Sequence, residues 1–223
     1  MSTSTIERVT DPPVKAVNPG VTPIIAVKRR TIDAVLIGLG IVAAVVFAVA
    51  GGLLTWGSNF SDDYVSKELA SQNISFPDAE SLTEEGRTDL LKFAGNKVDT
   101  GEEAEGYASF INGHLQTTAD GATYSELGVP QRAARAAVTA AVEADAPQAE
   151  IDALQADVDK ITAQRNSLFT GETLRGLLLS AYAWSTVGVI AGYAAFGAFI
   201  AAALTAVLVV LGLFHHHKAV KAS

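Results

Sequence analysis

The sequence predicts a mainly α fold, in which two transmembrane helices are separated by a helical extracytoplasmic domain. Three observations support this fold class. Two long stretches carry no charged residue, basic residues flank each stretch on the side of the nearer chain terminus, and the segment between them is acidic. The chain has 223 residues, of which 49% are hydrophobic, and it contains no cysteine. The lack of cysteine excludes disulfide bonds, a thiol nucleophile and thiolate zinc sites.

The first 31 residues contain four prolines and many small or polar residues. Such a composition does not support a packed core, so we expect a disordered cytoplasmic tail over 1–31.

The first uncharged stretch runs from Ala34 to Phe60. Its most apolar part ends at Leu54 and measures roughly 31 Å as a helix, which matches a hydrocarbon core of about 30 Å. We therefore predict a transmembrane helix over 32–56. A cleaved signal peptide is the alternative, because an Ala-Val-Ala site lies within the stretch. Asp33 and the long preceding tail argue against that alternative.

The second uncharged stretch, 176–214, measures roughly 58 Å as a helix. It is too long for one perpendicular crossing, and no turn residues divide it. We expect an interfacial helix that continues into a second transmembrane helix, with the crossing itself from about Ser185 to Leu213. The residues before Ser185 either lie in the membrane interface or enter the domain.

Four residues are predicted to anchor the chain at the outer membrane interface. Trp and Tyr favour the headgroup level because the ring is apolar while its N–H or O–H remains hydrated. An arginine beside an uncharged helix either pairs with lipid phosphate or anchors the domain rigidly to the helix, and we favour the second reading. The predicted anchors are Trp56, Arg175, Tyr182 and Trp184, with the aromatic residues at one common level.

Basic residues set the predicted orientation. Lys28, Arg29 and Arg30 precede the first stretch, and three histidines and two lysines follow the second in the tail 215–223. Basic flanks stay in the cytoplasm, so both termini are predicted to be cytoplasmic. The segment 57–175 holds 21 of the 24 acidic residues and nine of the 16 basic residues, a formal charge of −12. It is therefore predicted to lie outside the plasma membrane, and its charge argues against nucleic acid as a partner.

The acidic domain shows several helix signals. Ser61, followed by two aspartates, predicts an N-cap and a short helix to about Gln72. A further helix is expected near 87–94. Thr100 and Glu103 form a capping-box pattern. The clearest amphipathic helix follows it, with apolar residues at helical spacing: Ala104, Tyr107, Ala108, Ile111 and Leu115.

Prolines begin two helices that are predicted to form a hairpin over 130–168. Pro130 opens an alanine-rich helix, and Pro147 opens a second helix that runs to about Leu168. The second helix carries a coiled-coil seam of apolar residues, with Arg165 at one position of that seam. Packing between these adjacent helices is the favoured interpretation, and a coiled-coil partner site is the alternative.

Small residues recur on both predicted transmembrane helices. Small residues let helix backbones approach closely in lipid, where no hydrophobic force drives association. We expect the two helices to pack on each other, with a homo-oligomer or a larger complex as the alternative. No charged residue lies within either crossing, which argues against a transporter, a proton relay or a voltage sensor. The predicted helix-packing residues are Gly40, Ala44, Ala48 and Gly52 in the first helix and Gly188, Gly192, Gly197 and Ala201 in the second.

The sequence shows no P-loop, GxSxG or HExxH pattern, and we assign no catalytic, cofactor-binding or metal-binding residue. His114 is the one histidine between the two uncharged stretches, and its helix position predicts a side chain at the border of the core. A single histidine cannot supply a three-His zinc site or a two-His iron site. The C-terminal histidine run predicts a basic membrane flank, because consecutive helical side chains point about 100° apart.

Three blocks of sequence carry a resemblance to known proteins: Gln72 to Pro77, Gly101 to Leu115 and above all Gly171 to Tyr182. They resemble an uncharacterised family of actinobacterial two-span membrane proteins, some members of which are labelled ring-opening dioxygenases. The resemblance implies a bacterial membrane location. It transfers no functional residue, because His114 alone cannot build the iron site of such an enzyme.

These features predict a non-enzymatic integral membrane protein without a cofactor. We expect an accessory or scaffold component whose partners are the lipid bilayer and either another protein or a second copy of the chain. An extracytoplasmic ligand-binding or sensory module is the alternative, although the short tails hold no recognisable signalling domain.

Overall fold

The computed structural model describes residues 29–221, with side-chain positions for residues 31–217. Most of the tail predicted over 1–31 therefore lies outside the described residues, while residues 29–31 already belong to the first helix. The described residues form no β-strand, so the prediction of a mainly α fold is confirmed. The elements are α1 (Arg29–Ser71), α2 (Ala79–Glu84), the 3-10 helix η1 (Thr88–Phe93), α3 (Gly101–Thr118), α4 (Gly128–Glu143) and α5 (Gln148–Lys221).

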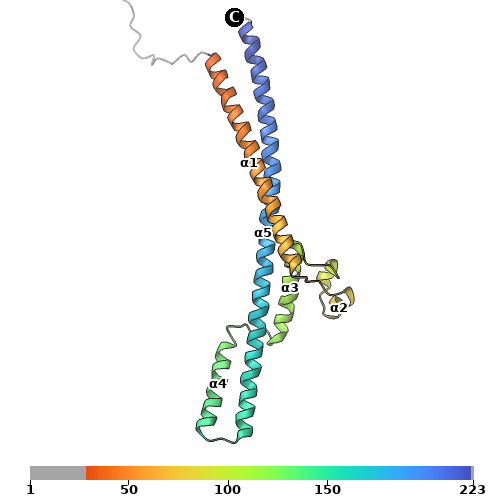
Figure 1. Ribbon diagram of the computed structural model, residues 1–223, viewed down its shortest axis with the longest axis vertical. Coiled ribbons are helices and arrows are strands. Elements are labelled where there is room, and N and C mark those ends of the chain that lie inside the picture. Colours follow the sequence, from red (N-terminus) through yellow and green to blue (C-terminus); the bar gives the residue numbers. More distant parts are fainter. Residues whose placement is uncertain (1–28, 222–223) are drawn as a thin grey trace, which may run out of the picture.

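The helices α1 and α5 form a long antiparallel pair that dominates the molecule (Figure 1). Both are long and apolar enough to cross a membrane. In the most apolar window of each helix only 6% of the residues are buried inside the molecule. The central helix of a soluble protein would instead hide most of its apolar side chains. The chain therefore has two candidate membrane-spanning helices, as the sequence predicts.

The two long helices pack through a seam in which covered residues recur every seven positions. A repeat of seven residues keeps one face of an α-helix turned toward a partner when the two helices coil gently around each other. In α5 the seam continues beyond the apolar part of the helix and into the part that packs on α3. Covered seam positions are Ile37, Ala44, Gly51, Ser58 and Val65 in α1 and Gly188, Ala195, Ala202 and Val209 in α5.

The helix α1 passes through Ser61 without interruption, so the predicted N-cap at this position is wrong. The Ser61 hydroxyl donates a hydrogen bond of 2.7 Å to the carbonyl of Trp184 in α5. The following turns stay helical because Val65 and Leu69 keep the same face against α5 and are both buried. A serine that finds a partner in a neighbouring helix does not have to cap its own helix.

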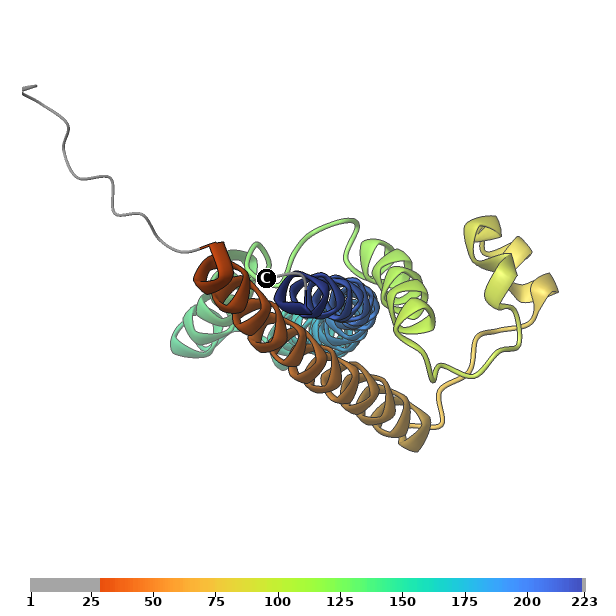
Figure 2. The ribbon, with the colours of Figure 1, turned by 90° about the horizontal axis from the view of Figure 1, so that it is seen from above.

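The central domain consists of α2, η1, α3 and α4 together with the parts of α1 and α5 that pack on them. Its main core lies where the end of α1 meets α3 and the middle of α5. Leu82 and Val98 are 0% and 1% exposed, and burying such side chains contributes about 1.5–3 kcal/mol each. Seen from above, α1 crosses α5 obliquely, whereas α2 and η1 lie farthest from α5 (Figure 2).

Local signals set the helix boundaries of the domain. Asp78 caps α2 by accepting a hydrogen bond of 2.8 Å from the N–H of Ser81. The capping box predicted for Thr100 and Glu103 is confirmed, since each side chain accepts a hydrogen bond from the backbone of the other residue. Gly95 has a φ of 73°, a conformation that suits glycine, and it ends the 3-10 helix η1 in the region where an α-helix was expected.

The helix α4 and the first turns of α5 form an antiparallel hairpin at the end of the molecule farthest from the C-terminus (Figure 1). The helix α4 starts at Gly128, two residues before the predicted proline, and α5 starts directly after Pro147. The second helix does not end near Leu168 as expected. It continues as one helix of 74 residues to Lys221, because the seam residues beyond Leu168 pack first on α3 and then on α1.

Candidate functional site

Three of the predicted helix-packing glycines lie between α1 and α5. A Cβ atom on Gly188 would lie 3.0 Å from the Cβ of Ser61, and one on Gly192 would lie 3.1 Å from the Oγ of Ser58. At the other end of the pair, a Cβ on Gly40 would lie 2.6 Å from Val209. These glycines therefore allow the close approach of the two helices. Ala44 and Ala201 are half-buried along the same pair.

The other predicted packing residues face away from the helix pair. Ala48 is exposed, and nothing lies within 4 Å of a Cβ added at Gly52 or Gly197. The reason is the period of the packing, because a repeat of four residues drifts off a seam that recurs every seven. Gly51 and Ala195 take the seam positions instead, with Gly51 against Phe199 and Ala195 only 3% exposed. Any helix contact made by Gly52 or Gly197 therefore has to come from outside this chain.

The contacts between α1 and α5 determine which residues lie at the same height. Ser58 contacts Gly192, so Trp56 is level with the residues just after Gly192, such as Tyr193. Trp184 lies nine residues before Tyr193, or roughly 13 Å away along the helix axis. Trp56 and Trp184 therefore do not lie at one common level along the helix pair, contrary to the expectation from the sequence. The extent of an uncharged stretch does not reveal how two helices are aligned.

Tyr182 and Arg175 lie on the part of α5 that packs against the domain. A Cβ atom on Gly101, at the start of α3, would lie 3.6 Å from the Cα of Tyr182. Arg175 donates a hydrogen bond of 2.9 Å to Glu172, one turn away on the same helix. Leu178, between them in sequence, is 5% exposed and belongs to the main core. Of the two placements that the sequence left open, this part of α5 thus enters the domain.

A groove of about 550 Å³ lies between the last turns of α1, the middle of α5 and one side of α3. We call it the interhelical groove. Buried Val65, Leu69 and Leu178 contribute apolar surface to it, and Tyr107 and Ile111 of α3 line its side. Its volume falls within the range of about 300–1,000 Å³ that is usual for small-molecule sites. The polar lining residues Glu68, Gln72 and Ser180 are exposed.

A second hollow of about 460 Å³ adjoins the interhelical groove on the side of the helix pair. Tyr64 and Trp184 line both spaces, so the two lie side by side. The second hollow reaches Gly57 on α1 and Ala191 on α5. It runs beside an aromatic ladder on α1, in which the rings of Trp56 and Phe60 stack at 5.7 Å and those of Phe60 and Tyr64 at 6.0 Å.

Large apolar side chains stand exposed along the edges of the interhelical groove. Tyr64 is 55% exposed, Leu177 is 64% exposed and Trp184 is 60% exposed. A contiguous exposed apolar surface on a domain indicates a binding site. Burial raises the pKa of Tyr107, so its hydroxyl stays protonated at neutral pH. The groove therefore offers apolar contact with few hydrogen-bonding groups.

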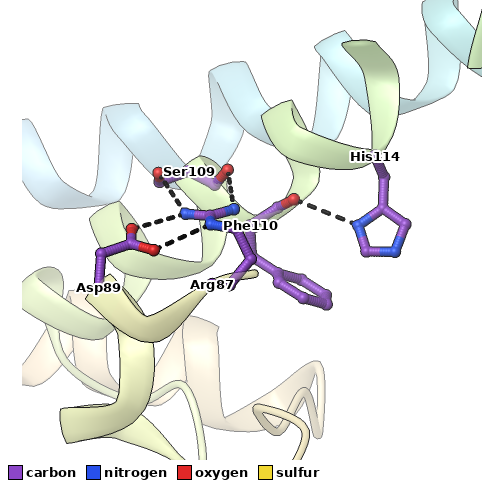
Figure 3. Close-up of polar contacts among 5 residues, drawn as sticks. All are labelled: Arg87, Asp89, Ser109, Phe110 and His114. Atoms are coloured by element: carbon purple, nitrogen blue, oxygen red, sulfur yellow. Dashed lines mark hydrogen bonds and ion pairs between the residues drawn. The ribbon is translucent and has the colours of Figure 1, made fainter. Parts of the chain in front are cut away.

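A polar cluster holds the segment between α2 and η1 against α3 (Figure 3). The Arg87 guanidinium donates to both carboxylate oxygens of Asp89, at 3.1 and 2.9 Å, and to the carbonyl and hydroxyl of Ser109, at 2.8 and 2.9 Å. The hydrogen bond to Arg87 lowers the pKa of Asp89, and the same bond raises that of Arg87. Since all three nitrogens of the guanidinium donate to groups of the same domain, we read the cluster as structural.

His114 lies on the exposed side of α3, and its side chain is 57% exposed. Its Nδ1 atom lies 3.3 Å from the carbonyl oxygen of Phe110, and its ring packs against the Phe110 ring at 4.7 Å (Figure 3). The expected border position is thus more open to water than the helix pattern indicated. Among residues 29–221, no group of three or more His, Asp or Glu side chains is placed to hold a metal ion.

Comparison with protein-family models, with curated proteins and with solved structures gives no match for this chain. Its function has to be inferred from its own geometry.

The residues of the interhelical groove were not assigned from sequence. The sequence does carry a signal for them, because Tyr64 and Glu68 are four residues apart on one face of α1 and Gln72 directly follows the last residue of that helix. The partner face on α5 was hidden in the uncharged stretch, whose first residues look the same whether they meet lipid or protein.

Proposed function

We propose that this protein is a non-enzymatic integral membrane protein of the bacterial plasma membrane, in which α1 and α5 cross the bilayer and the domain lies outside. Both termini are then cytoplasmic. The observation that carries the proposal is the exposure of large apolar side chains along both helices. Leaving one such side chain in water costs about 1.5–3 kcal/mol relative to burial, so a surface made of many of them requires an apolar surrounding. Exposed examples are Leu36, Leu39, Val42, Val46, Leu53, Phe196, Leu204, Leu208 and Leu211.

The alignment of the helices supports a single hydrocarbon layer. Ile37 contacts Gly212 and Ser61 contacts Gly188, which are 24 residues apart on each helix. The apolar residues 34–54 of α1 therefore lie opposite about 195–215 of α5. Each stretch measures roughly 31 Å, close to the hydrocarbon thickness of about 30 Å. This alignment moves the outer end of the second crossing from the predicted Ser185 to about residue 195, level with Trp56 and Tyr193.

The charge distribution supports the orientation. Arg29 and Arg30 begin α1, with Lys28 before them in the sequence, and the residues after Phe214 add histidines and lysines at the adjacent end of α5. Cytoplasmic flanks are enriched in Lys and Arg, whereas the segment 57–175 carries a formal charge of −12.

A scaffold role fits the continuity of α5. One helix of 74 residues, roughly 111 Å long, connects the α4 hairpin, the main core and the membrane crossing. A partner bound at the hairpin would therefore be held at a fixed distance from the bilayer. The outward glycines Gly52 and Gly197 offer additional surfaces for a helix of another chain in lipid.

Cysteine labelling tests the topology directly, because the chain contains no natural cysteine. Thr139→Cys in α4 is expected to react with a membrane-impermeant maleimide on intact cells. Ser4→Cys is expected to react only after the membrane is opened. The reverse pattern, or recovery of the chain in the soluble fraction without detergent, would contradict the proposal.

Purification in mild detergent tests the scaffold role. We expect a stoichiometric partner, or a second copy, that stays bound to a Gly38→Leu variant and is lost from a Gly52→Leu variant. Both glycines have open space around them, so neither change disturbs the α1–α5 pair. A monomeric chain without a partner would contradict the scaffold role.

The interhelical groove favours a second candidate function, that of an extracytoplasmic ligand-binding module. A concave apolar site of about 550 Å³ lies where a ligand can contact α1, α3 and α5 at once.

A further inference from the structure

We propose that the interhelical groove and the hollow that adjoins it hold one aliphatic chain of a phospholipid from the outer leaflet. The inference rests on the proposed function, because it requires α1 and α5 to cross the membrane with the domain outside. It specifies the occupant of the groove, which the ligand-binding candidate leaves open.

Continuity with the lipid-facing surface points to this occupant. The hollow that reaches Gly57 and Ala191 lies beside the stretch where the proposed hydrocarbon layer gives way to headgroups. Tyr64 and Trp184 line both this hollow and the interhelical groove. Apolar lining therefore extends from the proposed membrane surface to the core of the domain. The apolar molecule nearest to its entrance is the chain of a neighbouring lipid.

The dimensions suit a single chain. The lining residues of the two hollows on α1 extend from Gly57 to Leu69, or roughly 18 Å along the helix. A lipid chain in one leaflet spans half of the hydrocarbon core, or roughly 15 Å. The combined hollows are thus long enough for one chain.

The chemistry of the lining selects the chain over the headgroup. The side chains that line the two hollows include no lysine and no arginine, so an anionic headgroup would find no counter-charge. Glu68 is the one carboxylate among them, and it is exposed at the edge of the groove. The surfaces of Val65, Leu69, Leu178 and Ala181 favour aliphatic groups, whose burial contributes about 0.8 kcal/mol per CH₂.

The two tryptophans of the chain allow a direct test. In a Trp56→Phe variant Trp184 is the sole tryptophan, and it lies roughly 16 Å beyond the proposed edge of the hydrocarbon layer. The variant is placed in phospholipid nanodiscs whose lipids carry bromine near the end of the acyl chain. Bromine quenches tryptophan on contact, and in an ordinary bilayer these atoms stay near the midplane. We expect Trp184 to lose most of its emission.

A matched pair of variants links the quenching to the groove. Leu177→Glu places a charge in the lining and is expected to abolish the quenching of Trp184. Leu179→Glu changes an exposed leucine of the same helix outside the lining and is expected to leave the quenching intact. Equal quenching in both variants would overturn the inference, because Trp184 would then meet bromine elsewhere.

The remaining outcomes separate the inference from the proposed function. In a Trp184→Phe variant Trp56 is the sole tryptophan. Its emission is measured in nanodiscs whose lipids carry bromine close to the headgroup. Quenching of Trp56 without quenching of Trp184 overturns the lipid occupant and leaves the membrane crossing intact. Absence of quenching for both tryptophans overturns the crossing itself. Quenching of Trp184 by added brominated fatty acid, but not by brominated phospholipid, overturns the assignment to a leaflet lipid.

Discussion

Glu103 shows how much one side chain organises at the start of α3. One carboxylate oxygen accepts hydrogen bonds from the N–H groups of Asp99 and Thr100, at 3.2 and 3.1 Å, and from the Thr100 hydroxyl at 2.9 Å. The other accepts from Asn96 at 3.3 Å. Burial alone would raise the pKa of Glu103, but these hydrogen bonds outweigh it and lower the pKa below the ordinary 4.5. The ionised form is therefore the one that stabilises the fold.

The sign of this shift gives a pH-dependent prediction. Because the pKa is lower in the folded state, the stabilisation is complete above about 4.5 and is lost as the pH falls through the folded-state pKa. Glu103→Gln is expected to reduce stability by about 0.5–1 kcal/mol at neutral pH, toward the low end for a helix cap that is open to water. Thermal unfolding in detergent at neutral and acid pH measures the difference.

Glu102→Gln is the control for Glu103. Glu102 forms only an exposed ion pair with Lys92, and such pairs contribute little. Its substitution should leave the unfolding temperature nearly unchanged at each pH. If Glu103→Gln lowers the unfolding temperature as much at acid pH as at neutral pH, the assigned role of the carboxylate is contradicted.

At the scale of elements, a polar network joins α4 to α5. Gln131 is 7% exposed and donates a hydrogen bond of 2.8 Å to the Thr162 hydroxyl, while its carbonyl oxygen accepts from Arg165. Arg165 also donates to the backbone carbonyl of Tyr124 at 3.2 Å. Its guanidinium carbon lies 4.1 Å from the centre of the Tyr124 ring. The sequence placed Arg165 at a seam position of a coiled coil. The structure shows why a charged residue is tolerated there, since two of its nitrogens donate hydrogen bonds within the domain and its guanidinium lies over an aromatic ring.

This network predicts non-additive substitutions. Arg165→Leu leaves the buried Gln131 carbonyl without its donor and is expected to destabilise the hairpin by about 1–3 kcal/mol. Adding Gln131→Leu should recover most of that loss, because replacing both partners by apolar groups is close to neutral. Amide hydrogen exchange along α4 measures the effect.

Arg135→Leu, at an exposed position of α4, is the control and should leave exchange unchanged. If the double variant is as unstable as the sum of the single ones, the two side chains are not coupled as the structure indicates.

At the scale of the whole molecule, the alignment of α1 with α5 determines where the domain would stand relative to the proposed membrane. Ser58 and Gly192 provide a direct probe of it. A Cβ atom on Gly192 would lie 3.9 Å from the Cβ of Ser58, within the 3.5–4.5 Å that a disulfide requires. The double variant Ser58→Cys with Gly192→Cys is therefore expected to form an intramolecular disulfide. Proteolytic cleavage between the two positions should leave the fragments joined until reduction.

The control for the disulfide pairs two outward positions, Gly52→Cys with Gly197→Cys. Nothing lies within 4 Å of a Cβ atom added at either glycine, so no intramolecular bond is expected. A disulfide between two chains in this control would support self-association in the membrane. Failure of the Ser58 and Gly192 pair to cross-link would contradict the alignment and the membrane position derived from it.

Local patterns in the sequence were sufficient for several elements. The capping box at Thr100, Pro130 in the first turn of α4 and Pro147 before α5 predicted helix starts within two residues, because these signals act over one turn. The fate of Ser61 was not predictable in the same way. A serine before two aspartates is a good N-cap in isolation, and only the carbonyl of Trp184, 123 residues away, makes it an interior residue of α1.

The candidate site was less predictable than the helices. The five residues Gly40, Ala48, Gly52, Gly188 and Gly192 each have another small residue four positions away in the sequence. Only three of the five, Gly40, Gly188 and Gly192, contact the other long helix. A composition rule cannot distinguish the face that meets the partner helix from the face that meets lipid, because both environments accept small residues.

The sequence by itself determined that the chain is mainly helical and that two of its helices are apolar enough to cross a membrane. Those properties follow from side-chain chemistry and short-range spacing, which act wherever the segment lies. Only the tertiary structure decided which part of α5 belongs to the domain and that an apolar groove opens between α1, α3 and α5. These features depend on how distant helices are aligned, and that alignment is set by contacts between residues far apart in the chain.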